Sequence, residues 1–114
     1  NAVAEGLYYL DTMTKDRKLA QPLGLRDCAG PSCPEAVESP YAGRGIRHLR
    51  SNLLGFQRLF LGCGVPEEGP GFDDLLTAAG AGELQSRMRG DLDAALRSVD
   101  ALTSPSLAAA ITQE

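Results

Sequence analysis

Hydrophobic residues recur at helical spacing along most of this chain. The clearest stripe lies within residues 42–61, where five apolar residues follow one another at intervals of three and four positions. Its members are Ile46, Leu49, Leu53, Phe56 and Phe60. Leucines beside the stripe widen this apolar face, so the predicted helix should be covered on two sides, as inside a bundle. Gly55 is unfavourable in a helix interior and indicates a close helix crossing or a bend.

Four more helices are predicted around this one. Residues 2–18 carry apolar residues at steps of four and three positions, and residues 83–102 repeat that spacing over a longer stretch. A short helix is predicted over residues 72–79, because two aspartates stand where its first turn would meet the positive end of the helix dipole. A last helix should run from Ser104 toward Ile111, since serine followed by proline is typical of a helix N-terminus.

These segments predict an all-α, up-and-down bundle of four to five helices, formed by residues 1–114 as a single domain. Composition agrees, because the chain of 114 residues has no Trp and only 5% aromatic residues, so its core must be mainly aliphatic. The formal net charge of −4 argues against a nucleic-acid partner. No apolar run approaches the roughly 18 residues of a membrane span.

A loop of about twenty residues with four prolines separates the first two predicted helices. It contains Cys28 and Cys33, and the Gly-Pro pair between them forms a turn that can bring two cysteines to disulfide distance. We predict a Cys28–Cys33 disulfide that braces the loop and indicates an oxidising compartment. Free thiols and metal ligation remain alternatives, although two thiolates and a single His in the chain are too few for a closed zinc site. The role of Cys63 stays open.

The predicted helix over residues 42–61 carries a basic cluster near its start, formed by Arg44, Arg47, His48 and Arg50. These side chains are candidates for contact with an anion or with another domain. Alternatively they are solvated and paired with acidic residues. The acids weighed for that pairing are Asp11, Asp16, Glu67 and Glu68. Metal binding by His48 is disfavoured, because the neighbouring cations repel a bound cation.

The sequence predicts no catalytic and no metal-ligating residue in this chain. No GxSxG nucleophile motif is present. Adjacent acids such as Asp73 and Asp74 do not face each other on a helix, and His48 and Cys63 would stand about 22 Å apart on an unbroken helix. The aromatic residues are interpreted as core, with a ligand groove as the alternative. They are Tyr8, Tyr9, Tyr41, Phe56, Phe60 and Phe72.

The order of these parts resembles a known family. The segment YYLDTMTKDRKLAQPLG, a Pro-rich loop, GRGIRHLRSNLLGFQRLFLG and then GPGFDDLLTAAGAGELQSRMRGDLDAALRSVDAL are similar to the C-terminal half of the imelysin-like family. Its members are bacterial envelope proteins associated with iron uptake, historically called M75 peptidases. The resemblance covers most of the chain.

The resemblance implies a periplasmic, all-helical protein, lipid-anchored through a segment before Asn1 in some cases, whose N-terminal half would be this chain's partner. Iron or zinc would belong to the full-length protein, and a metal or a small anionic ligand is a further candidate partner. The family's GxHxxE motif is absent here: Gly45 stands three residues before His48, and Ser51 three after it. We therefore expect a non-catalytic half of a metal-uptake protein. The alternatives are part of a metallopeptidase whose site lies upstream, and a stand-alone structural or adaptor bundle.

Overall fold

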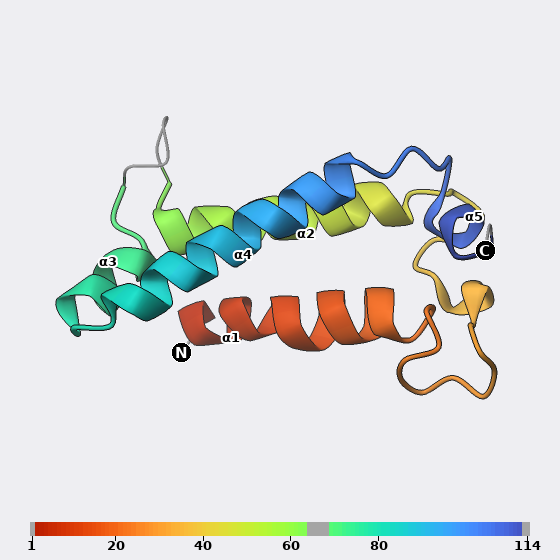
Figure 1. The fold of residues 1–114 in the computed structure, drawn as a ribbon, viewed down its shortest axis with the longest axis horizontal. Helices are drawn as coiled ribbons and strands as arrows, with labels where there is room; N and C mark the ends of the chain where they lie inside the picture. The colour runs from red at the N-terminus through yellow and green to blue at the C-terminus, as the bar shows by residue number, and fades with distance from the viewer. Residues whose placement is uncertain (1, 64–68, 113–114) are drawn as a thin grey trace.

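The computed structural model describes residues 2–63 and 69–112, and over these ranges it is helical, without strands (Figure 1). The predicted all-α architecture is therefore confirmed. The molecule is elongated, measuring 45 × 27 × 23 Å. The helical elements are α1 (Ala2–Tyr9), η1 (Leu10–Ala20), η2 (Pro34–Ala36), α2 (Gly45–Leu61), α3 (Phe72–Ala78), α4 (Gly82–Asp100) and α5 (Leu107–Thr112).

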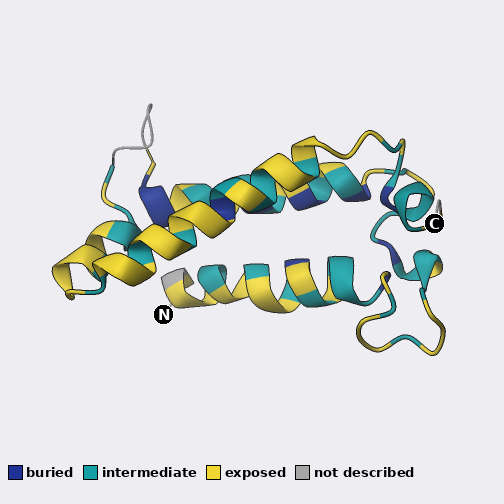
Figure 2. Ribbon diagram, in the orientation of Figure 1, coloured by how far each residue is buried: buried dark blue, intermediate teal, exposed yellow. Residues whose placement is uncertain are grey.

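Helix α2 is the centre of the fold, and the buried residues gather along it (Figure 2). Its C-terminal half joins α4 in one core cluster, made of Leu53, Phe60, Leu61 and Leu92. Its N-terminal half joins the loop and α5 in a second cluster, made of Val37, Leu49 and Leu107. The apolar stripe predicted from the sequence thus serves two separate cores, one at each end of the same helix.

The sequence predicted one α-helix over residues 2–18, and the structure differs from this prediction. The first helix is α-helical in α1 and then π-helical through η1, which ends at Ala20. An α-helix would place Leu10 and Leu19 half a turn apart, because nine residues at 3.6 per turn make two and a half turns. In a π-helix each turn holds more residues, roughly 4.4, so both leucines face α2. There Leu10 packs on the first core and Leu19 on the second.

Two predicted helix starts are corrected by the structure. Helix α2 begins at Gly45 rather than at residue 42, because Gly43 has a left-handed φ of 61° that interrupts helical geometry. Helix α5 begins at Leu107, and its N-cap is Ser106 rather than Ser104. The Ser106 Oγ accepts a hydrogen bond from the Ala109 backbone N–H at 3.1 Å.

The backbone at the end of α2 and the backbone just before α3 approach each other closely, and two glycines there leave no room for a side chain. Gly62 ends α2 with a φ of 90°, and a Cβ on it would stand 2.0 Å from the Gly69 carbonyl oxygen. A Cβ on Gly71 would stand 2.3 Å from the Phe60 carbonyl oxygen. The predicted acidic start of α3 is confirmed, because Asp73 and Asp74 lie in its first turn and the Gly71 N–H donates to Asp74 Oδ2 at 3.0 Å.

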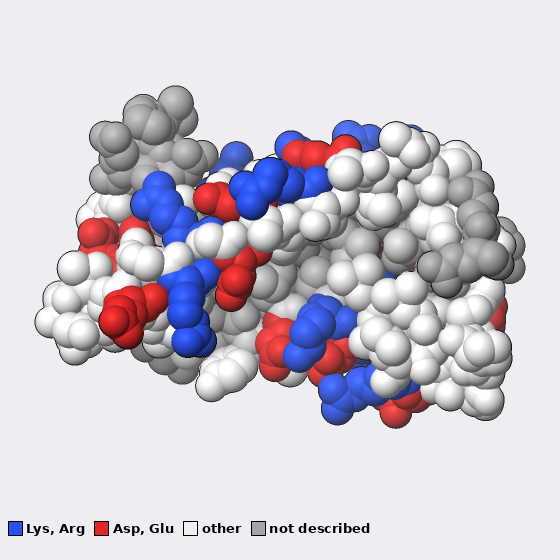
Figure 3. Space-filling view, in the orientation of Figure 1, with Lys and Arg blue, Asp and Glu red and all other residues white. Residues whose placement is uncertain are grey.

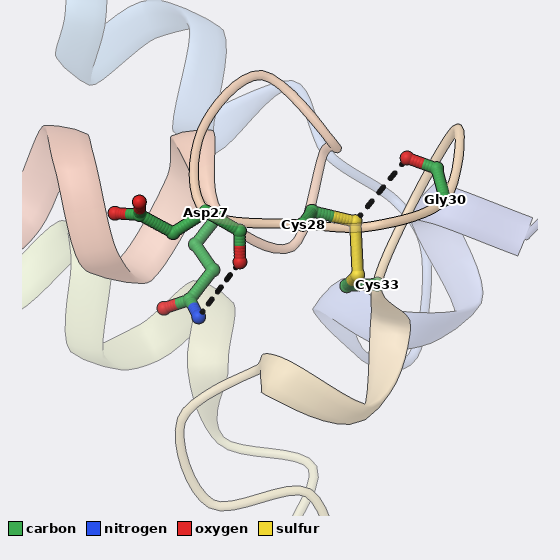
Figure 4. Close-up of a disulfide and its surroundings, with 5 residues drawn as sticks. Asp27, Cys28, Gly30 and Cys33 are labelled. Carbon is green, nitrogen blue, oxygen red and sulfur yellow. Dashed lines mark hydrogen bonds between the residues drawn. A yellow bond between two sulfur atoms is a disulfide. The ribbon is translucent and has the colours of Figure 1, made fainter.

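The predicted disulfide is present in the long loop after the first helix (Figure 4). Cys28 and Cys33 have Cα atoms 6.0 Å apart. The Cys33 N–H donates to the Pro22 carbonyl at 2.8 Å, which ties the far side of the loop back to the end of the first helix. The Cys28 sulfur also lies 3.3 Å from the Gly30 carbonyl oxygen, a packing contact because a bridged sulfur has no hydrogen to donate.

Candidate functional site

An open apolar groove runs between α1 and α4, with α2 as its floor. It consists of two adjoining hollows of about 270 and 370 Å³, which share Phe56 and Met88. Both α1 and α4 pack on α2, whereas α1 and α4 touch each other slightly at most. Figure 3 shows the result as an uncharged strip between charged side chains of the two helices. We call this the α1–α4 groove.

Both walls of the groove present residues at helical spacing. Helix α4 contributes Met88, Asp91, Leu92 and Ala95, at offsets of three, four and seven residues. The first helix contributes residues with the same offsets, and α2 and α3 add three aromatic or aliphatic side chains. These residues are Ala4, Leu7, Tyr8, Leu10, Asp11, Leu53, Phe56 and Phe72. Such walls have the form in which a further amphipathic helix is usually bound.

The aromatic residues divide among the core, the groove and the exposed surface, in contrast to the prediction that all would be core. Phe60 is fully buried and its ring stacks on Phe56, with centroids 5.9 Å apart. Tyr8 is 67% exposed on the groove, and Tyr41 is fully exposed away from it. Of the two alternatives predicted for Gly55, the close helix crossing is wrong, because a Cβ there would meet no atom within 4 Å; the bend stays a prediction.

The basic cluster of α2 is split between two surroundings. Arg44, Arg47 and Arg50 line a separate hollow at the start of the helix. Arg50 pairs with Asp100 at the end of α4, with 2.6 Å between Arg50 Nε and Asp100 Oδ1. The hydrogen bond to Asp100 and its negative charge raise the pKa of Arg50 above its ordinary value.

The acids proposed from the sequence as partners of the arginines have other roles. Asp11 pairs with Lys15, and Asp16 with Lys15 and Arg26. Glu67 and Glu68 lie outside the described residues. The predicted pairing of Asp11 and Asp16 with the arginines of α2 is therefore wrong. Arg50 pairs instead with Asp100, fifty residues further along the chain.

His48 turns away from the arginines toward the loop. Its Nδ1 lies 3.2 Å from Glu38 Oε2, and Lys18 Nζ lies 3.1 Å from the same oxygen. Both distances lie within ion-pair range, and the His48 contact is an ion pair only when the imidazole is protonated. Partial burial raises the pKa of the Glu38 carboxyl, but Lys18 and then His48 outweigh that effect and lower it below 4.5. The cluster joins the first helix, the loop and α2.

Replacing Glu38 by glutamine should lower stability only where Glu38 is ionised. A carboxyl whose pKa is lowered by folding stabilises the protein above its unfolded pKa and loses that contribution as the pH falls through the folded pKa. We expect Glu38→Gln to cost about 1 kcal/mol or less near neutral pH, because the group is partly exposed. Urea denaturation should show this difference shrinking as the pH falls below 4.5 and then through the lowered folded pKa. Glu35→Gln, an exposed neighbour, is the control, and an equal effect there would contradict the assignment to the cluster.

The described residues offer no set of metal ligands. Across residues 2–63 and 69–112, no three His, Cys, Asp or Glu side chains come together in a group that could hold an ion. Cys63, the remaining cysteine, is exposed, with its sulfur 3.9 Å from the Arg58 carbonyl oxygen. The residues seen here therefore do not fit the iron or zinc that the resemblance implies. No helix in the same ranges is both long and apolar enough to cross a membrane.

The sequence did not reveal the α1–α4 groove, nor the acidic partners of His48 and Arg50 in the basic cluster of α2. The sequence indicates a groove only as the alternative use of Tyr8, Phe56 and Phe72, and its helical spacing over residues 83–102 does not reveal that Met88 and Ala95 line one. Glu38 and Asp100 were not singled out, because no local pattern pairs them with His48 and Arg50. Only Asp100 carried a signal, as an acid at the end of a helix where a cation is the more favourable neighbour.

A family model described as imelysin, peptidase M75, matches residues 1–114. No curated protein and no solved structure matches the chain.

Proposed function

The chain belongs to the imelysin family, and from this membership we propose that it is a non-catalytic scaffold half whose α1–α4 groove is covered by a second helical half of the same protein. The observation that carries the proposal is the groove itself. Two helices stand on a third without closing on each other, so one side of the bundle remains apolar and open. A fourth helix in the groove would complete a bundle and remove this surface from water.

Chemistry in this protein would then be supplied by the other half. Within the described residues there is no ligand set for iron or zinc. A role in metal uptake, or in peptide hydrolysis by a metal site upstream, would therefore draw its ligands from outside the described residues. We also infer a location in the periplasm or cell envelope; the Cys28–Cys33 bridge supports it, because disulfides persist in oxidising compartments.

A substitution on the groove tests the proposal. In the natural full-length polypeptide, Tyr8→Glu should lower stability by about 2 kcal/mol or more, because it would place a charge in a covered apolar contact. It should also raise the fluorescence of 8-anilinonaphthalene-1-sulfonate, a dye that binds exposed apolar surface. Tyr41→Glu is the matched control, since Tyr41 is fully exposed and does not line the groove.

Three results would overturn the proposal. One is equal behaviour of Tyr8→Glu and Tyr41→Glu. Another is dye emission from the full-length protein as strong as that from residues 1–114 alone. The third is tight binding of iron or zinc by residues 1–114 in calorimetry, which would place the metal site in this half.

A further inference from the structure

A second hollow lies at the opposite end of α2 from the turn into α3 and is chemically unlike the α1–α4 groove. It is open to solvent, has a volume of about 540 Å³, and lies between the start of α2, the end of α4 and the connection to α5. Arg44, Arg47 and Arg50 line it, and Val99, Leu102 and Pro105 form an apolar part of its wall. We call it the arginine cavity.

The fold fixes the arginines on one side of this cavity. They are spaced three residues apart at the beginning of α2, so their side chains follow one another around the same side of the helix. The start of α2 is held by α5, because a Cβ on Gly45 would stand 3.1 Å from the Leu107 Cβ. Gly43, with its left-handed φ, brings the preceding turn close to Ser106. The arginine side chains are flexible, but their points of attachment are set.

The charges around the cavity are not balanced. Arg50 has Asp100 as its partner, whereas no ion pair within 4.0 Å involves Arg44 or Arg47 among the described residues. The first turn of α2 contains no acidic residue, although that end of a helix favours negative charge. Two guanidinium groups and the helix dipole therefore act in the same direction on one hollow. Their field attracts an anion.

We propose that the arginine cavity binds a small multivalent oxyanion, held by Arg44 and Arg47 through its carboxylate or phosphate oxygens. The planar guanidinium offers paired N–H donors that match two oxygens of such a group. The apolar wall formed by Val99 and Leu102 accommodates a short carbon skeleton between the charged groups. Asp100 repels the anion and is already paired with Arg50, so its presence lowers the affinity for the anion.

The test is to titrate small anions into the full chain at constant ionic strength. NMR signals of the backbone amides and of the arginine Nε–H groups report binding. The probes are tricarballylate, a tricarboxylate, and inorganic phosphate. We expect saturable shifts at Arg44, Arg47 and the adjoining turn with at least one probe. Saturation by tricarballylate alone would assign the site to carboxylates, and saturation by phosphate alone would assign it to phosphates.

Two sets of variants separate a site from general charge attraction. Arg44→Gln combined with Arg47→Gln should weaken binding about tenfold or more, since each removes a charged hydrogen-bond donor. Arg87→Gln combined with Arg89→Gln removes the same charge from an exposed part of α4 outside the cavity, and should change affinity less than about twofold. Asp100→Asn should tighten binding severalfold, because it removes a like charge and releases Arg50.

The proposal fails if neither probe saturates, if both double variants lose affinity equally, or if Asp100→Asn weakens binding. Unfolding of the Arg44/Arg47 variant would be visible in its NMR spectrum. In that event the Asp100→Asn variant alone tests the proposal. The proposal expects tighter anion binding by this variant, whereas a loss of structure would weaken binding.

Discussion

Replacing Phe60 by alanine is expected to lower the free energy of unfolding by about 3–5 kcal/mol. Phe60 is fully buried at the C-terminal end of α2, where it packs with Leu53, Leu61 and Leu92. Truncation removes the apolar contact area and leaves a cavity that the surrounding helices can fill only in part. Because domains of this size have total stabilities of about 5–15 kcal/mol, this one change should bring the protein close to unfolding.

Urea denaturation followed by circular dichroism measures this effect. Leu59→Ala is the matched control, since Leu59 is the preceding residue on the same helix and 40% exposed. Its loss should be about 1 kcal/mol, in keeping with partial burial. Equal losses in the two variants would show that the end of α2 is not the core we describe.

Replacing Gly62 by alanine is expected to cost about 3 kcal/mol or more. The φ of 90° at Gly62 is itself unfavourable for a residue with a side chain, by about 1–3 kcal/mol. The added Cβ would also stand 2.0 Å from the Gly69 carbonyl oxygen, so the backbone between α2 and α3 would have to move. That movement would disturb Gly71, which lies against the Phe60 carbonyl, and with it the start of α3.

Gly80→Ala separates the two causes. Gly80 has a similar φ of 76°, but a Cβ there would meet no atom within 4 Å. It should therefore cost only about 1–2 kcal/mol, from backbone conformation alone. Thermal and urea denaturation of both variants should show Gly62→Ala as clearly the less stable. If the two losses match, the close approach between Gly62 and Gly69 contributes nothing.

Most of the helices could be predicted because their signals are local. The stripe in α2 depends on residues three and four apart, and the start of α3 on acids in one turn. The disulfide was predictable for the same reason, since Cys28 and Cys33 are five residues apart with a turn between them. In each case the residues that determine the structure lie within about two turns of one another.

What the sequence did not reveal depends on tertiary packing. The π-helical register of η1 follows from two leucines that must reach separate cores along α2, and those cores exist only in the folded protein. The α5 cap is Ser106 rather than Ser104, because the chain must first extend from α4 to the start of α2.

The candidate sites were harder to predict than the helices. Arg50 and Asp100 are fifty residues apart, so no spacing rule could pair them. The arginines themselves were visible as a cluster, but the hollow that they line requires three elements to meet. Likewise, the apolar faces of α1 and α4 were visible, while the space between them depends on how both helices lean on α2.

The arrangement of the first helix also bears on the order in which the fold comes apart. Ala2–Tyr9 rest on α2 and have little support from α4, whereas η1 is held by Lys18, by Leu19 and by the hydrogen bond from Asn52 to the buried Thr14. Local opening of α1 should therefore stop near Thr14. Amide protons of α1 would exchange with solvent through this local opening, whereas those of α2 would exchange only on global unfolding.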